Sequence, residues 1–103
     1  LMKPRFVNLR TKIAPILKPY ARRVSVFGSF ARGEETPQSD IDLLMALKPA
    51  GQRPPLGLFE VIRLEKELEK RLGRSVDLIT EEGLNPHIKA SVEKEKVVLY
   101  EEI

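Results

Sequence analysis

Two aspartates at the start of an apolar segment constrain this chain more than any other feature. Asp40 and Asp42 open a stretch that continues to Leu47 with the residue types of a buried strand. Side chains alternate between the two faces of a strand, so both carboxylates lie on one face, with Cα atoms about 6.6 Å apart. At an effective dielectric constant of about 20, two charges at that distance repel by about 2.5 kcal/mol. A divalent cation would offset this repulsion. For an isolated pair, two solvated aspartates in a turn are the alternative.

A short apolar strand precedes the aspartates and ends at a turn of small residues. We expect this strand at Val24 to Phe27, followed by Gly28 and Ser29. Glycine lets the chain turn sharply and lets another group come close to the backbone. Ser29 is expected to begin a short helix through Arg32, whose first N–H groups have no partner within the helix. Such groups bind phosphate, so the two segments together predict a site for Mg²⁺ and a nucleoside triphosphate.

A third carboxylate, Asp77, interrupts the apolar segment from Ser75 to Thr80. In a strand, Val76 and Leu78 would share one face, and Asp77 would lie on the other. A carboxylate in the middle of a short apolar strand is disfavoured by strand propensity and by burial. A metal site would explain it, and a hydrogen bond to a neighbouring loop is the alternative.

These residues fall into a spaced motif. The motif reads Gly28-Ser29-x-Ala31-Arg32-Gly33, then five residues, then Ser39-Asp40-x-Asp42-Leu43. It resembles the signature of the minimal nucleotidyltransferases, a branch of the DNA polymerase beta-like superfamily. The resemblance covers nearly the whole chain, and Asp77 fills the place of the third acidic residue that family members carry on a later strand.

The resemblance implies a role for each matching residue. Gly28 and Ser29 would hold the triphosphate, Asp40 and Asp42 would bind two Mg²⁺ ions, and Asp77 would share in metal binding and help to activate the attacking hydroxyl.

Two further residues are expected to serve the nucleotide site. Arg32 would contact phosphate, with an ion pair to Asp or Glu that holds the turn as the alternative. Ser39 is expected to cap the turn before Asp40 through a local hydrogen bond.

The implied function is that of an enzyme, a nucleotidyltransferase that transfers AMP from ATP to a hydroxyl on a protein partner. In the family the usual partner is a HEPN-type toxin, so an antitoxin role is expected. The alternative is a non-catalytic antitoxin that neutralises the toxin by binding. A nucleotide-binding module is a weaker third interpretation, because binding alone needs no third carboxylate. The sequence leaves the acceptor hydroxyl and the nucleotide base open.

Length and pattern predict one α+β domain over residues 1–103. For the turn at Gly28 to face Asp42, the first two strands must be antiparallel. The third strand follows through a helix and is expected to be parallel to the second. The prediction is a small mixed sheet of three to four strands with helices on its apolar face.

Composition excludes several classes of site. The chain has no cysteine, so a disulfide framework, a thiolate zinc site and a cysteine nucleophile are ruled out. A single histidine, His87, cannot build a histidine metal site. No apolar run approaches the length of about 18 residues that a membrane span needs, and no signal-peptide pattern is present. We therefore expect a cytoplasmic protein without a membrane partner.

Charge is distributed unevenly. Residues 1–32 carry eight Lys and Arg and no acid, whereas residues 33–103 carry ten Lys and Arg and fifteen Asp and Glu. A basic end attracts nucleic acid, a nucleotide or an acidic partner, although a solvated helix face explains it equally well. Direct nucleic-acid binding is not expected. The basic N-terminal third and the apolar segment from Val97 to Tyr100, a strand or a docked tail, are candidate docking surfaces.

The remaining pattern predicts the connecting elements. Apolar spacing predicts helices over Phe6 to Leu17, where Pro15 should kink or restart the helix, and over Leu56 to Leu72. The charged stretch from Glu65 to Arg71 is predicted to be a solvated face. Asn85 and Pro86 are expected to open a short helix. The loop from Lys48 to Pro55 contains Arg53, which would reach a phosphate if the loop folded over the site.

Overall fold

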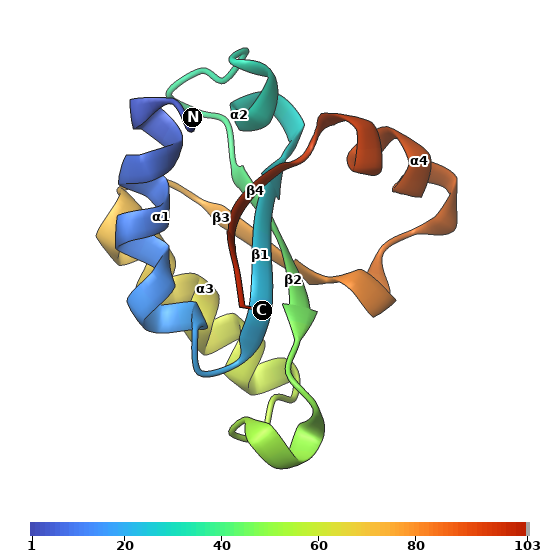
Figure 1. The fold of residues 1–103 in the computed structure, drawn as a ribbon. Coiled ribbons are helices and arrows are strands. Elements are labelled where there is room, and N and C mark those ends of the chain that lie inside the picture. Colours follow the sequence, from blue (N-terminus) through green and yellow to red (C-terminus); the bar gives the residue numbers. More distant parts are fainter. Residues whose placement is uncertain (103) are drawn as a thin grey trace.

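Four strands form one mixed sheet in the order β3-β2-β1-β4. The computed structural model describes residues 1–102 (Figure 1). In chain order the elements are α1 (Pro4–Leu17), β1 (Ala21–Phe27), α2 (Gly28–Arg32), β2 (Ile41–Leu47), η1 (Ala50–Gln52), α3 (Leu58–Leu72), β3 (Val76–Thr80), η2 (Glu81–Gly83), α4 (Pro86–Glu95) and β4 (Val97–Glu101). The predicted α+β class is confirmed.

Strand directions follow the expected pattern. β1 runs antiparallel to β2 and to β4, whereas β2 and β3 are parallel. The C-terminal segment is therefore the edge strand β4 and not a docked tail. Leu99 of this strand is 1% exposed, and the Tyr100 hydroxyl donates a hydrogen bond of 3.1 Å to the carbonyl oxygen of Ala21.

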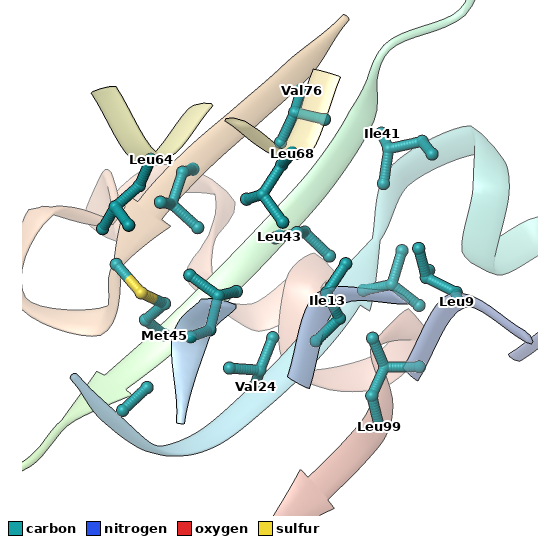
Figure 2. Packing of buried hydrophobic residues seen from close by; sticks show 14 of the residues in the cluster. Leu9, Ile13, Val24, Ile41, Leu43, Met45, Leu64, Leu68, Val76 and Leu99 are labelled. Carbon is teal, nitrogen blue, oxygen red and sulfur yellow. The ribbon is translucent and has the colours of Figure 1, made fainter. Parts of the chain in front are cut away.

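Helices α1 and α3 cover one face of the sheet, and their apolar stripes form the main core with it. Figure 2 shows Ile13 of α1 and Leu68 of α3 beside Leu43 of β2 and Val24 of β1, all buried. The apolar residues at helical spacing in α1 and α3 and those on one face of the strands thus form a single apolar layer.

The opposite face of the sheet is also covered in part. Leu44 lies on the same face of β2 as Asp42, yet it is 1% exposed. It belongs to a second small cluster with Phe27, Leu84 and Val92, to which α4 contributes Val92. Figure 1 shows α4 on the side of the sheet away from α1 and α3. In addition to the predicted helix layer, α4 and the segment before it therefore shield part of the face that carries the site.

Helix α1 continues without a break through Pro15 to Leu17. The expectation that Pro15 restarts the helix is wrong. Pro15 lies in the last turn, where its missing N–H removes one hydrogen bond, and its ring is exposed to solvent.

Helix α3 begins at Leu58, two residues later than predicted. Gly57 precedes it as the N-cap, and its N–H donates to the carboxylate of Glu60 at 2.6 Å. The helix ends as predicted at Gly73, which adopts the left-handed conformation with φ of 74°.

One part of α3 differs from the predicted solvated face. Glu69 accepts a hydrogen bond of 3.1 Å from the N–H of Val76, and Glu65 accepts one of 2.8 Å from the N–H of Leu78. β3 is an edge strand, so these outward N–H groups have no neighbouring strand. The two glutamates therefore complete the hydrogen bonding of the sheet edge.

Helix α4 begins as its sequence predicts. The side-chain oxygen of Asn85 accepts a hydrogen bond of 2.9 Å from the N–H of His87, and Pro86 takes the first helical position.

No helix within residues 1–102 combines the length and apolar character needed to span a membrane.

Candidate active site

The register of β2 and β3 places two of the predicted aspartates opposite each other. Asp42 pairs with Asp77 across the parallel ladder, and Phe27 at the end of β1 pairs with Asp42 from the other side. Asp42 is half-buried, whereas Asp77 is exposed. Asp40 is also exposed and lies two residues before Asp42, just outside the strand. The three carboxylates therefore gather where β2 and β3 begin and β1 ends.

Burial and neighbouring charge act together on Asp42. Burial raises the pKa of Asp42, and the charges of Asp77, Asp40 and Glu95 raise it further, to about 6, against an opposing effect of Arg32. Within residues 1–102 none of the three aspartates forms an ion pair. The site thus holds several carboxylates without a paired cation.

Carboxylates of this kind suit a hard cation such as Mg²⁺, which binds oxygen ligands. Among residues 1–102, no group of three or more His, Cys, Asp or Glu side chains is arranged so that it could hold a metal ion. The chemistry of the donors therefore fits the cation, while the structure gives no closed ligand cage.

Gly28 lies directly against Asp42. Its φ of 71° belongs to the left-handed region, and a Cβ built on it would collide with Oδ2 of Asp42. A residue without a side chain is required here for two separate reasons. The turn at Gly28 and the aspartate pair, predicted as two parts of one site, are in contact.

The backbone N–H of Gly28 donates a hydrogen bond of 3.0 Å to Oε1 of Glu95, at the end of α4. The other oxygen of Glu95 accepts a 2.9 Å hydrogen bond from the guanidinium of Arg32, which also pairs with Glu34 at 2.9 Å. The hydrogen bond from Arg32, followed by that from Gly28, lowers the pKa of Glu95. Arg32 thus takes the ion-paired arrangement that the sequence left open beside phosphate contact.

Sequence reasoning missed Glu95. It lies 67 residues after Gly28, in a stretch of alternating Lys and Glu that is typical of an exposed helix end. No local pattern marks it, because its contact with Gly28 depends on how α4 packs on the sheet.

Ser39 forms the local hydrogen bonds predicted for it. Its hydroxyl oxygen accepts from the N–H of Thr36 at 2.9 Å, and its own N–H donates to the carbonyl oxygen of Thr36 at 3.0 Å. These bonds close the turn immediately before Asp40.

Arg53 does not approach the site. Its side chain donates to the carbonyl oxygen of Lys48 at 2.9 Å, just beyond the end of β2. The aspartates lie at the start of that strand, so the loop does not meet the condition under which Arg53 would reach a phosphate. The chain between β2 and α3 turns beside its own strand and does not fold over the site.

A mixed sheet with a Gly-Ser turn and three aspartates at the strand starts defines a class of proteins, the nucleotidyltransferases. The family model described as Nucleotidyltransferase domain matches residues 10–99. The chain belongs to this family. A solved structure of a minimal nucleotidyltransferase is 36% identical to it and matches with a TM-score of 0.66 over 89% of this chain and 93% of that chain, which places the chain in the minimal nucleotidyltransferase branch.

Relatives from two organisms are similar to most of the chain. The protein MJ0435 of Methanocaldococcus jannaschii is 38% identical over 91 residues, which cover 87% of this chain and 92% of the relative. The protein of Thermococcus cleftensis named protein adenylyltransferase MntA is 37% identical over 76 residues, which cover 74% of this chain and 72% of the relative.

A solved structure shares the fold. It is a tri-AMPylated HEPN toxin of Shewanella oneidensis in complex with an MNT antitoxin, and it matches with a TM-score of 0.64 and 19% identity. The match covers 93% of this chain and 72% of the matched chain. At that identity, the similarity concerns the fold.

Proposed function

We propose that this nucleotidyltransferase transfers AMP from ATP to a hydroxyl of a protein partner, and that the partner is a HEPN-type toxin that the chain neutralises. The observation that carries the proposal is the position of Asp42, which lies opposite Asp77 and against the backbone of Gly28. The relative named protein adenylyltransferase supports the reaction, and the AMPylated HEPN toxin in the related complex supports the partner.

In this proposal Asp40 and Asp42, with Asp77 in part, hold two Mg²⁺ ions. Mg²⁺ held by these carboxylates would supply the positive charge that phosphoryl transfer needs. Gly28 and Ser29 bind the leaving phosphates through the turn. The guanidinium of Arg32, which lies close to this turn, contacts the same phosphates. Ser39 keeps the turn before Asp40 closed. These residues contribute mainly by positioning and charge stabilisation.

The reaction forms one bond and breaks one. The acceptor oxygen bonds to the α-phosphorus, and the bond from that phosphorus to the oxygen bridging to the β-phosphorus breaks. Pyrophosphate leaves with the electron pair of the broken bond. Asp77, exposed beside Asp42, is the carboxylate that accepts the proton of the attacking hydroxyl.

The test uses purified protein, α-labelled ATP, Mg²⁺ and a HEPN protein from the same genome. We expect label on the HEPN protein with the unaltered chain and loss of transfer by about 100-fold or more with Asp42→Asn. Glu82→Gln, which removes an exposed carboxylate beyond the far end of β3, is the control and should transfer label normally.

Two results would contradict the proposal. Equal labelling by the Asp42→Asn variant would show that transfer does not depend on this carboxylate. Full neutralisation of the toxin by a variant that transfers no label would show that binding alone suffices, which is the non-catalytic alternative.

A further inference from the structure

The carboxylate of Glu95 lies on groups that the proposed function assigns to the triphosphate. Oε1 accepts from the backbone N–H of Gly28 at 3.0 Å, and Oε2 accepts from the guanidinium of Arg32 at 2.9 Å. A backbone N–H and a guanidinium that converge on one oxyanion are also the donors that a phosphate group uses. The carboxylate of Glu95 therefore occupies hydrogen-bond donors that a phosphate would need.

A phosphate and this carboxylate cannot use those donors together. Each is an anion, and two anions at hydrogen-bond distance from the same N–H would repel each other strongly. The donors are not sealed from solvent, because the Arg32 side chain is 44% exposed and that of Glu95 is 23% exposed. A nucleotide arriving from solution can therefore reach both donors, provided that the Glu95 side chain moves away.

The element that carries Glu95 is lightly held. Val92 is the buried residue of α4, whose other side chains are mostly exposed. Glu95 is the last residue of the helix, so its side chain can swing out without disturbing Val92. Displacement of Glu95 therefore requires no rearrangement of the sheet.

We propose that Glu95 acts as an internal competitor that occupies part of the triphosphate site in the free protein and leaves it when nucleotide binds. This inference rests on the proposed function, because it takes the turn at Gly28 to be the phosphate site. Its consequence is a lowered affinity for nucleotide, set by a residue outside the motif. Departure of the Glu95 carboxylate also frees Arg32 to contact the phosphates.

The experiment measures binding of ATP with Mg²⁺ by calorimetry and follows the amide signal of Gly28 by NMR. Glu95→Gln keeps the shape of the side chain and removes its charge, and Glu95→Ala removes both contacts. We expect both variants to bind ATP about tenfold more tightly than the unaltered chain, the effect of removing one charge-assisted competitor. The matched control is Glu93→Gln on the same helix, since Glu93 pairs with Lys96 and not with the turn. It should leave the affinity unchanged.

The outcomes separate this inference from the proposed function. If ATP shifts the Gly28 amide signal but both Glu95 variants bind it equally or more weakly, Glu95 supports the turn and the competitor role is wrong. If ATP leaves the Gly28 signal unmoved in every variant, the phosphate site itself is wrong and both proposals fail. Thermal melting of each variant verifies that the fold is intact.

Discussion

At the scale of single residues, Asp42 brings burial and charge together. Its raised pKa, about 6 in the folded chain against about 3.9 in an unfolded one, means that folding favours the protonated form. Below about pH 4 the group is protonated in both states and costs nothing. As the pH rises towards 6 the folded protein loses stability, and above 6 the loss is complete and constant.

Asp42→Asn should therefore stabilise the metal-free protein at neutral pH. We expect its free energy of unfolding at pH 7.5 to rise by about 1 kcal/mol, allowing for solvent screening of a half-buried group, and the gain to vanish near pH 4. Urea denaturation at both pH values in the presence of a chelator measures this difference. Glu82→Gln provides the control, and a destabilised Asp42→Asn at pH 7.5 would show that the carboxylate makes favourable contacts instead.

Gly28 is a second residue with a specific stability effect, because one added side-chain atom would collide with Asp42. Gly28→Ala adds a Cβ both at a positive φ and against the carboxylate of Asp42, whereas Gly33→Ala adds one at a φ of 74° with nothing within 4 Å. Gly33→Ala should thus cost about 1 kcal/mol from backbone strain alone. Gly28→Ala should cost about 1 kcal/mol more, because Asp42 must also move.

A double-mutant cycle checks that reason. In an Asp42→Ala background the collision partner is gone, so Gly28→Ala should cost no more than Gly33→Ala. If the cost of Gly28→Ala is the same in both backgrounds, the contact with Asp42 plays no part in it. The same variant should also impair transfer, since a displaced Asp42 can no longer serve the site.

At the scale of elements, the edge of β3 depends on α3. Glu65→Ala leaves the N–H of Leu78 without its partner, so we expect the free energy of unfolding to fall by about 1 to 2 kcal/mol. Glu67→Ala changes an exposed residue of the same helix and should alter it by about 0.5 kcal/mol at most. Thermal or urea unfolding compares the two variants. Equal effects would mean that the bond to β3 contributes nothing beyond helix propensity.

Local rules predicted the elements well because each rule acts over a few residues. The spacing of Leu64 and Leu68 predicted α3, and Gly73 and Asn85 marked a helix end and a helix start correctly. The role of Glu65 could not be predicted, because a glutamate on a helix has the same local pattern whether it meets water or a strand edge. Its partner depends on the packing of α3 beside β3.

At the scale of the whole molecule, the strand directions were predictable because the motif's halves had to meet. Gly28 and Asp42 can face each other only across an antiparallel pair, and the crossover through α3 makes β3 parallel to β2. The position of α4 had no such constraint. Its packing across the site face therefore came from the structure alone, and with it the contacts of Glu95.

The net charge of the chain does not describe the charge around the site. Three of the eight cations in the basic N-terminal third are paired with acids from later in the chain: Arg5 with Glu35, Arg23 with Glu81 and Glu101, and Arg32 with Glu34 and Glu95. The site itself gathers Asp40, Asp42, Asp77 and Glu95. A chain with a formal charge of +3 thus presents an acidic surface where the nucleotide is proposed to bind.

This acidic surface predicts that ATP binding depends on Mg²⁺. ATP carries several negative charges, so without a cation it must approach like charge, and we expect its affinity in a chelator to fall by at least about tenfold. Calorimetry with and without Mg²⁺ measures the change. Adenosine, which lacks phosphates, is the matched ligand and should bind independently of Mg²⁺. Asp42→Asn should narrow the difference for ATP, because it removes one repelling carboxylate and one metal ligand together. Equal ATP affinity with and without Mg²⁺ would show that the phosphates bind away from the aspartates.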